Sequence, residues 1–444
     1  MEKFDEIIIG AGPAGLAMAY PLAAAKRKVA VVEADLWGGT CPNRGCDPKK
    51  VLLAAVEAQD QVRNLQKVGV LTQPAKIDWS KLMAFKKTFT DPVSTSSEKG
   101  LASSGITTLT GAAKFIDEQT IEVAGTTYQA EHYIIATGAR PAIPNISGKE
   151  HFQDSTDFMA LPEMPRVVTF VGGGYEAFEF AAMANAAGAE THVIQHNDRP
   201  LKAYDHELVD QLVEQLQAKG VQFHFNVSLQ AIETAGDQLI LNAPDFRLVT
   251  NAVFATTGRV PNVEALDLAA AGIEVAHGGI QCDDHLQTTN PRVFVAGDII
   301  ARQEPKETPV ASFEGSYLVD YLTGKTQASI DYPAIPTTVY SSPKLAQVGV
   351  TTAKAQADSE HYAIKTIDTT NWLTYRRLNE PVAVVKIVTD KKTGLLVGAT
   401  CLNSLADELI NYFTLLINQK VSADTVAKSI YSYPTPASDL NYFY

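Results

Sequence analysis

Cysteine is scarce in this sequence: there are 4 among 444 residues, at positions 41, 46, 282 and 401. So few cysteines do not make the disulfide framework of a small extracellular protein. In a reducing compartment, a close pair such as Cys41 and Cys46 is more often catalytic or metal-binding than structural. Cys282 and Cys401 lie far apart in apolar-rich segments, which is typical of small buried side chains.

Long apolar runs and an excess of basic residues are absent as well. The run over residues 14–25 contains a proline and is much shorter than the roughly 20 residues that a membrane span needs. The first residues lack the basic-then-apolar pattern of a signal peptide, so we expect a cytoplasmic protein. The formal net charge is −13, which argues against a nucleic-acid partner because such proteins carry a basic footprint.

What the sequence does contain is a repeated strand–turn–helix–strand pattern. Residues 6–9 read as a strand, residues 10–15 as a glycine-rich turn, the stretch to about residue 26 as a helix, and residues 29–33 as a second strand. The pattern recurs over residues 166–195, and segments 134–141 and 253–261 also resemble each other. Two dinucleotide-binding units in tandem are therefore predicted.

Glycine is needed in each turn for a physical reason. The first glycine permits the bend, the second lets the backbone approach a pyrophosphate, and the third allows the helix to pack closely. The phosphates then lie at a helix N-terminus, where free N–H groups favour anions. The first unit assigns to cofactor binding Gly10, Gly12, Pro13, Ala14, Gly15, Glu33, Ala136, Thr137 and Gly138. The second assigns Gly172, Gly174, Tyr175, Glu176 and Gly258.

The two units differ at the end of the second strand. Glu33 can accept hydrogen bonds from both hydroxyls of an unphosphorylated ribose, which suits the adenosine half of FAD. The second unit has Gln195 and His196 instead, followed by Arg199 and Lys202. No carboxylate repels a 2′-phosphate there and cations can attract one, so NADPH is favoured over NADH. The alternative is that these cations are solvated surface charges.

The cysteine pair lies in the segment 38–46, just after the first unit and before an apparent helix. Five residues of ideal helix rise about 7.5 Å, too far for a relaxed disulfide. Pro42 and Gly45 let the backbone leave helical geometry, so the pair can close. A helix N-terminus with Lys49 and Lys50 nearby is expected to lower a thiol pKa. A metal site would need further ligands that no nearby His or Cys supplies, and two ordinary thiols are the remaining alternative.

The later part of the chain changes character. A strand over residues 291–298 ends in Gly297 and Asp298, residues 332–336 resemble a linker, and alternating strands and helical stretches follow. The predicted fold class is α/β, with two tandem Rossmann-like domains and a C-terminal α+β domain. The expected boundaries are 1–142 for the first part of the FAD-binding domain, 143–262 for the NAD(P)-binding domain, 263–331 for the second part of the FAD-binding domain, and 332–444 for the C-terminal domain.

The motif Gly38-Gly39-Thr40-Cys41-x4-Cys46-x-Pro48-Lys49 resembles the signature of the pyridine nucleotide-disulfide oxidoreductases, a family that includes glutathione reductase, dihydrolipoamide dehydrogenase and mercuric reductase. The resemblance covers essentially the whole chain. It implies that NAD(P)H reduces FAD, which then reduces a disulfide between Cys41 and Cys46. Cys46 would contact the flavin, and Cys41 would attack the substrate.

The resemblance also implies roles for single residues. Lys49 would lie near the reactive nitrogen of the flavin with Glu179 as its carboxylate partner, and together they would tune the flavin electrostatically. Tyr175 would gate the nicotinamide pocket. The remaining assignments to cofactor binding are Gly39, Thr40, Lys50, Arg259, Gly297, Asp298, Thr308 and Pro309. No metal ligand is assigned. The family is homodimeric, and the C-terminal segment of the partner completes each active site.

The C-terminal segment departs from the family pattern. Tyr433 stands where a catalytic His is usual and Ser438 where a Glu is usual. A phenol can donate a proton but is a poor base at neutral pH, because its pKa is about 10. The leading hypothesis remains a glutathione-reductase-like enzyme that acts on a small disulfide. A reductase of metal ions or other electron acceptors, of the mercuric reductase type, is one alternative. A non-catalytic flavoprotein that senses redox state is another.

Overall fold

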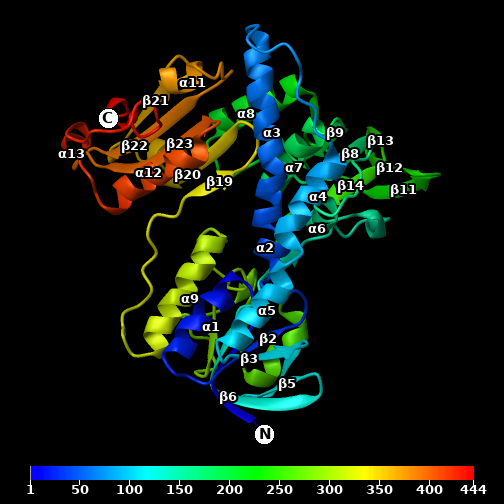
Figure 1. The fold of residues 1–444 in the computed structure, drawn as a ribbon, viewed down its shortest axis with the longest axis vertical. Helices are drawn as coiled ribbons and strands as arrows, with labels where there is room; N and C mark the ends of the chain where they lie inside the picture. Colours follow the sequence, from blue (N-terminus) through cyan, green and yellow to red (C-terminus); the bar gives the residue numbers. More distant parts are fainter. Residues whose placement is uncertain (1) are drawn as a thin grey trace. The chain divides into compact units, whose positions relative to one another are not determined.

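The computed structural model describes residues 2–444, which group into two compact units (Figure 1). Unit 1 comprises Met1–Lys49, Phe85–Ala142 and Arg259–Tyr332. Unit 2 comprises Lys50–Ala84, Ile143–Gly258 and Pro333–Tyr444. The division into four segments expected from the sequence stays a prediction. Within residues 2–444, no helix has the length and apolar character that would let it cross a bilayer.

Unit 1 is built on a seven-stranded sheet with the order β3-β2-β1-β6-β5-β4, and β18 pairs with β6. Its parallel strands are β1 (Glu2–Ile9), β2 (Val29–Glu33), β3 (Thr107–Thr110), β6 (Thr126–Ile135) and β18 (Val293–Val295). Strands β4 (Ala113–Asp117) and β5 (Thr120–Val123) extend it antiparallel. Ile7 and Ile8 are fully buried, as expected for a central parallel strand covered on both faces.

Two helices of unit 1 pack closely beside one another: α1 (Pro13–Ala24) and α9 (Thr308–Leu322) (Figure 1). A side chain on Gly315 of α9 would place its Cβ only 2.8 Å from the Ala14 carbonyl oxygen, so the contact requires glycine. The unit also holds α2 (Thr40–Arg44), the start of α3 (Cys46–Lys67), the end of α4 (Trp79–Thr90), and α5 (Val93–Ser103).

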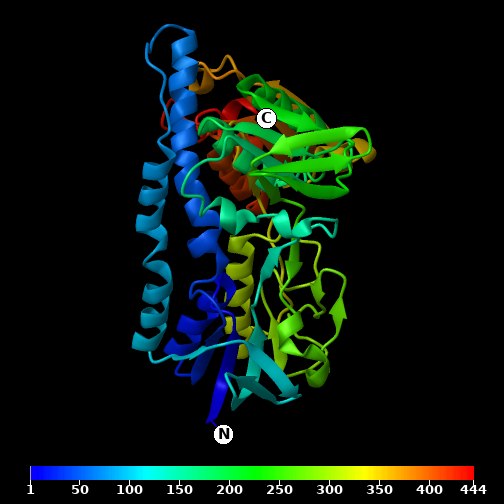
Figure 2. The same cartoon turned by 90° about the vertical axis from the view of Figure 1, so that its right-hand side faces the viewer.

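Unit 2 contains a second parallel sheet with the order β10-β9-β8-β14. Its strands are β8 (Val167–Val171), β9 (Glu190–Ile194), β10 (Val221–His224) and β14 (Ala252–Ala255). The accompanying helices are α6 (Ser155–Phe158), α7 (Tyr175–Ala186) and α8 (His206–Lys219). A separate antiparallel sheet of β11 (Ala231–Ala235), β12 (Gln238–Ala243) and β13 (Phe246–Thr250) is drawn in green in Figure 2.

The C-terminal part of unit 2 is a five-stranded antiparallel sheet with the order β19-β20-β23-β22-β21. The strands are β19 (Thr337–Val339), β20 (Lys344–Gly349), β21 (Tyr362–Asp368), β22 (Val384–Asp390) and β23 (Leu396–Asn403). The helices are α10 (Thr352–Ala357), α11 (Leu373–Arg376), α12 (Ala406–Asn418) and α13 (Ala423–Ala427). Helix α12 lies against β20 and β23 and buries Leu409 and Phe413.

The predicted fold class is confirmed, because two α/β sheets with glycine turns precede an antiparallel sheet with helices. The two similar segments noticed in the sequence pair with each other as β7 (Ala139–Pro141) and β15 (Arg259–Pro261), which run antiparallel. Element ends differ from the prediction by up to four residues, since β1 begins at Glu2 rather than Glu6. Helix α1, for example, ends at Ala24 rather than near Lys26, whose positive φ of 63° leaves helical geometry.

Candidate active site

The first glycine turn joins β1 to α1 and brings predicted residues together. Gly10 has a φ of 113°, and a Cβ there would lie 2.3 Å from the Ala136 carbonyl oxygen, so only glycine fits. Gly12 precedes α1 without any side-chain cap, and Pro13 occupies the first turn of the helix. No side chain caps the start of α1, so its backbone N–H groups can bind an anion there.

Glu33 and Gln195 make the same local hydrogen bond in the two units. Glu33 Oε2 accepts from the Ala11 N–H at 2.9 Å, and Gln195 Oε1 accepts from the Gly173 N–H at 2.7 Å. Each side chain thus holds the backbone N–H of the residue that follows the first glycine of its turn. The neutral amide also donates from Nε2 to Asn197 Oδ1 at 2.8 Å, a contact that the sequence analysis missed.

The cations predicted near the second unit's ribose site differ in their surroundings. The Arg199 guanidinium lies 3.3 Å from the Asp210 carboxylate, so part of its charge is already matched, whereas His196 and Lys202 are exposed. Asn197 Oδ1 also accepts from the Arg199 backbone N–H at 3.0 Å. The loop that carries these cations is therefore tied to Gln195 through Asn197.

The second glycine turn repeats the geometry of the first. Gly172 has a φ of 109°, and a Cβ there would lie 2.5 Å from the Thr256 carbonyl oxygen. The Thr256 hydroxyl donates to the carbonyls of Val171 and Gly172 at 2.9 and 2.8 Å, a role that the sequence did not reveal. Gly174 precedes α7 without a side-chain cap. Of the next two residues, Tyr175 is 43% exposed and Glu176 is buried.

The cysteine segment lies against the first glycine turn. Gly39 has a φ of 70°, and a Cβ there would lie only 2.5 Å from the Gly12 Cα. The helix is broken between the two cysteines at Gly45, where a Cβ would lie 2.9 Å from the Thr40 carbonyl oxygen. The predicted break is thus confirmed at Gly45, whereas Pro42 lies inside α2.

Cys41 and Cys46 do not form a disulfide in this structure. Cys46 Sγ lies 3.5 Å from Thr308 Oγ1 at the start of α9, a helix without a side-chain cap. Cys41 Sγ lies 3.9 Å from Asp47 Oδ1. The predicted Thr308 is therefore in contact with the pair, and Asp47 is a neighbour that the sequence analysis did not single out.

The sequence predicted a lowered pKa for one thiol of this pair without naming which, and for Cys41 the shift is upward. Hydrogen bonding to Cys46 and burial raise the pKa of Cys41 above its ordinary value, and negative charge on Cys46 and Asp47 raises it further, while the Thr308 hydroxyl lowers it. Two neighbouring thiols cannot both ionise easily, because the second proton leaves against the charge of the first thiolate. The pair is therefore expected to hold one negative charge rather than two.

The predicted lysine and glutamate belong to different units. Lys49 is buried one turn into α3, and its N–H donates to the Gly45 carbonyl oxygen. Glu179, 1% exposed on α7, accepts from the Tyr340 N–H at 2.7 Å. The Lys50 ammonium lies 3.6 Å from the centre of the Tyr340 ring, a cation–π contact. Pairing of Lys49 with Glu179 stays a prediction.

The Gly297–Asp298 turn is held by a residue that the sequence analysis missed. Glu314, fully buried on α9, accepts from the Gly297 N–H and from the Tyr332 hydroxyl, both at 2.7 Å, and forms an ion pair with Arg302. The Asp298 backbone oxygen accepts from Lys306 Nζ at 2.8 Å. The sequence did contain one signal for this role: Glu314 directly precedes Gly315, the glycine at which α9 packs against α1.

Residues 137–139 and residues 259–262, which lie at β7 and β15, are hydrogen-bonded to each other within unit 1. Thr137 Oγ1 donates to the Asn262 carbonyl oxygen at 2.9 Å, and the Asn262 N–H donates to the Gly138 carbonyl oxygen. The Arg259 guanidinium donates to the Ala139 carbonyl oxygen at 2.6 Å. These contacts place Thr137 and Gly138 beside Asn262, and Arg259 beside Ala139.

The C-terminal segment presents its predicted residue to solvent. Tyr433 is 70% exposed and the nearby Ile430 is 99% exposed. Ser438, in the position of the family Glu, closes a tight turn instead: its hydroxyl accepts from the Thr435 N–H and donates to the Thr435 carbonyl oxygen. Ser438 therefore has a local structural role.

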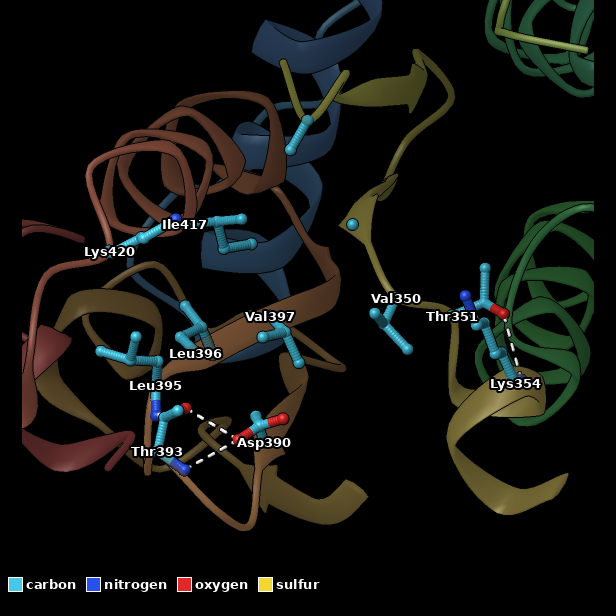
Figure 3. Close-up of a pocket in the computed structure, with 12 residues that line it drawn as sticks. Val350, Thr351, Lys354, Asp390, Thr393, Leu395, Leu396, Val397, Ile417 and Lys420 are labelled. Atoms are coloured by element: carbon cyan, nitrogen blue, oxygen red, sulfur yellow. Dashed lines mark hydrogen bonds between the residues drawn. The ribbon is translucent and has the colours of Figure 1, made fainter. Parts of the chain in front are cut away.

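A pocket of about 530 Å³ lies in the C-terminal part of unit 2, between the start of β23, the end of α12 and the start of α10 (Figure 3). None of its lining residues is a predicted site residue. Some of its polar groups pair with each other, since Asp390 accepts from Thr393 and the Thr351 hydroxyl accepts from the Lys354 N–H. Across residues 2–444, no three His, Cys, Asp or Glu side chains are grouped so as to hold a metal ion.

Comparisons with known proteins agree with this geometry. Residues 4–315 match the family model described as pyridine nucleotide-disulphide oxidoreductase, and residues 335–442 match the dimerisation domain of the same family. The chain therefore belongs to the pyridine nucleotide-disulphide oxidoreductase family. It is an FAD-dependent enzyme of that family, and the dimerisation domain implies a homodimer.

Relatives in this family have different activities. A mercuric reductase from Bacillus cereus is 31% identical over 98% of this chain and 70% of its own length. A dihydrolipoyl dehydrogenase from Bacillus subtilis (strain 168) is 30% identical over 97% and 93%. A glutathione reductase from Pisum sativum is 31% identical over 90% and 73%.

Among solved structures, the HOCl-induced flavoprotein disulfide reductase RclA from Escherichia coli is similar over 98% of each chain, with a TM-score of 0.90 and 26% identity. Its Cu(II) complex gives the same values. The residues present here fit FAD, since the Gly10 turn, the uncapped start of α1 and the Gly39 segment leave bare backbone where a pyrophosphate must approach. Bound FAD supplies two-electron transfer between a nicotinamide and the cysteine pair.

Proposed function

We propose that this enzyme takes electrons from NADPH and that its cysteine pair passes them to a metal cation. The observation that carries the proposal is the residue at the proton-transfer position: Tyr433 replaces histidine, and the sequence contains no histidine after His361. Breaking a disulfide releases a thiolate that an acid must protonate, and the returning step needs a base. A metal cation does not need the acid, because it accepts electrons without a leaving thiolate, and the protons of the two thiols pass to solvent.

The chemistry balances without an additional reductant. The two thiols of Cys41 and Cys46 give two electrons to two Cu(II) ions, form one disulfide and release two protons and two Cu(I) ions. NADPH and one proton return the disulfide to two thiols. The mercuric reductase relatives and the Cu(II) complex of RclA support a metal cation as the acceptor. Cys41 is the sulfur proposed to meet it, and Cys46 the sulfur proposed to face the flavin.

The cofactor half of the reaction is proposed to use the predicted residues. Glu33 is positioned by the Ala11 N–H to meet a ribose. Gln195 carries no charge to repel a 2′-phosphate, and exposed Lys202 and His196 can attract one, which favours NADPH. Lys49 and Glu179 are proposed to tune the flavin, Tyr175 to gate the nicotinamide, and Asp298 to hold the ribityl chain.

The partner subunit is proposed to complete each active site with its C-terminal segment. The high exposure of Tyr433 and Ile430 within a single chain supports this, because large apolar side chains are usually covered in the working assembly. The phenol of the partner's Tyr433 would then lie near Cys41, the sulfur that is proposed to meet the electron acceptor.

A small disulfide is the second candidate acceptor. It is favoured by the resemblance to glutathione reductase and by the ability of a phenol to donate a proton. In that case Tyr433→Phe should slow disulfide reduction by about tenfold or more, since general acid catalysis contributes at least that much. The same variant should reduce Cu(II) at the rate of the wild type.

The test begins with anaerobic addition of NADPH to the wild-type enzyme, followed by Cu(II), glutathione disulfide, quinones or oxygen. We expect a long-wavelength absorbance band from a thiolate beside the flavin after two electrons, and its loss in Cys46→Ser. Cu(II) should then discharge the band faster than the other acceptors. A band that persists in Cys46→Ser, or a faster discharge by glutathione disulfide, would contradict the proposal.

A further inference from the structure

We infer that Asp47 sets the charge preference of the acceptor site: it favours metal cations and disfavours anionic disulfides. The inference rests on the proposed function only for the identity of the cation. It begins from one distance, since Asp47 Oδ1 lies 3.9 Å from Cys41 Sγ, the sulfur proposed to meet the acceptor. An acceptor that contacts this sulfur must therefore come close to a carboxylate.

The carboxylate is oriented by the way the segment folds. Gly45 ends α2 and lets α3 begin at Cys46, so Asp47 stands in the first turn of α3 while Cys41 lies in α2. The close approach of the two helices at Gly45 brings the side chain of Asp47 to the earlier cysteine, Cys41. Asp47 is exposed to solvent, so it remains accessible to an arriving ion.

The Asp47 carboxylate lies against Cys41, and its negative charge raises the pKa of that thiol. The Arg44 guanidinium forms an ion pair with Asp35, Lys49 is buried, and the Lys50 ammonium lies over the Tyr340 ring. The neutral hydroxyl of Thr308 also contacts the sulfur pair. The charge next to Cys41 is therefore negative.

This arrangement sorts acceptors by their charge. A divalent cation is attracted to Asp47 on its way to the sulfur, whereas glutathione disulfide, which carries a net negative charge at neutral pH, is repelled. Two sulfurs and one carboxylate oxygen do not form a preformed metal site in residues 2–444. That suits a substrate, which must leave after it is reduced.

Asp47 has a simpler structural role that must be separated from this one. An acidic residue in the first turn of a helix stabilises the helix dipole, and its loss would weaken α3 for every acceptor equally. The charge role instead predicts changes of opposite sign for cationic and anionic acceptors, each measured relative to the change for a neutral acceptor, because loss of Asp47 also lowers the pKa of Cys41 for all three. The sign of the effect therefore distinguishes the two roles.

The experiment compares the wild-type holoenzyme with Asp47→Asn, Asp47→Glu and Asp237→Asn, the last removing an equal charge from an exposed hairpin turn. Each is assayed with Cu(II), with the neutral bis(2-hydroxyethyl) disulfide and with glutathione disulfide. In Asp47→Asn, kcat/KM relative to that for the neutral disulfide should fall about threefold to tenfold for Cu(II) and rise about threefold for glutathione disulfide, as expected for exposed charges. Asp47→Glu and Asp237→Asn should match the wild type.

Two further readouts make the result decisive. Flavin reduction by NADPH should be the same in all four proteins, and the effect in Asp47→Asn should shrink at high salt because exposed charges are screened. Equal changes for all three acceptors, or none, would overturn the role of Asp47. If the wild type does not reduce Cu(II), the proposed metal acceptor fails, while the comparison of the neutral and anionic disulfides still tests Asp47.

Discussion

The fully buried carboxylate of Glu314 accepts a hydrogen bond from the backbone N–H of Gly297 at 2.7 Å. Glu314 also accepts from Tyr332 and forms an ion pair with Arg302, whose burial lowers its pKa. Asp298, the predicted ribityl ligand, follows Gly297 directly. Glu314 therefore fixes the backbone from which that ligand projects.

Glu314→Gln is expected to lower the free energy of unfolding by about 3 kcal/mol, because it removes the carboxylate that is ion-paired with the buried Arg302 guanidinium. FAD affinity should fall at the same time. Tyr332→Phe removes one hydrogen bond and should cost only about 1 kcal/mol. Denaturant unfolding and FAD titration of the apoprotein measure both effects. Equal stability of the two variants would contradict the charge argument.

Gly39→Ala is expected to prevent FAD binding, because its Cβ would lie 2.5 Å from the Gly12 Cα at a φ of 70°. Gly69→Ala is the matched control: its φ is 77°, yet nothing lies within 4 Å of the added Cβ. The control should cost about 1 kcal/mol from backbone strain alone, whereas Gly39→Ala should cost at least about 3 kcal/mol. Flavin content and denaturant unfolding distinguish them.

Thr308→Val should raise the pKa of Cys41 further, because the Thr308 hydroxyl lowers that pKa in the native protein. A hydroxyl that donates to sulfur stabilises the thiolate, so its loss favours the thiol. Alkylation of the reduced enzyme by iodoacetamide should then become slower at a given pH, and its pH profile should move upward. Thr308→Ser keeps the hydroxyl and should retain the native profile.

Gln195→Glu should move the enzyme from NADPH toward NADH. A glutamate can still accept from the Gly173 N–H, but its charge repels a 2′-phosphate and attracts ribose hydroxyls. We expect the ratio of kcat/KM for NADPH to that for NADH to fall about tenfold, or ~1.4 kcal/mol. Glu190→Gln changes the charge at the other end of β9 and should leave the ratio unaltered. An unchanged ratio in Gln195→Glu would contradict the assignment.

The parts of the site that the sequence revealed are those set by backbone geometry. Gly10 and Gly172 were recognisable because a turn of this kind tolerates no side chain, and the structure gives both a positive φ and a carbonyl oxygen in the way of a Cβ. Similar segments around Ala139 and Arg259 could be noticed as a repeat. Their pairing as β7 and β15 depends on the fold and could not.

The parts that the sequence did not reveal depend on contacts between distant or differently oriented side chains. The raised pKa of Cys41 arises from Cys46, burial and Asp47 together, whereas the sequence suggested only the nearby lysines. Glu314 reaches Gly297 across the space between a helix and a turn. No local pattern reports such a contact, because a glutamate in a helix is usually solvated.

The pairing of β7 with β15 has a consequence for how the chain is assembled. Arg259 lies opposite Pro141, so the chain leaves unit 1 and returns to it at neighbouring strands, about 5 Å apart. The intervening segment 143–258, which belongs to unit 2, is thus entered and left at adjacent strands of unit 1. Replacing it with a segment of different cofactor preference would have to preserve two junctions at β7 and β15 and also its shared core with Leu52 and Leu345 in unit 2.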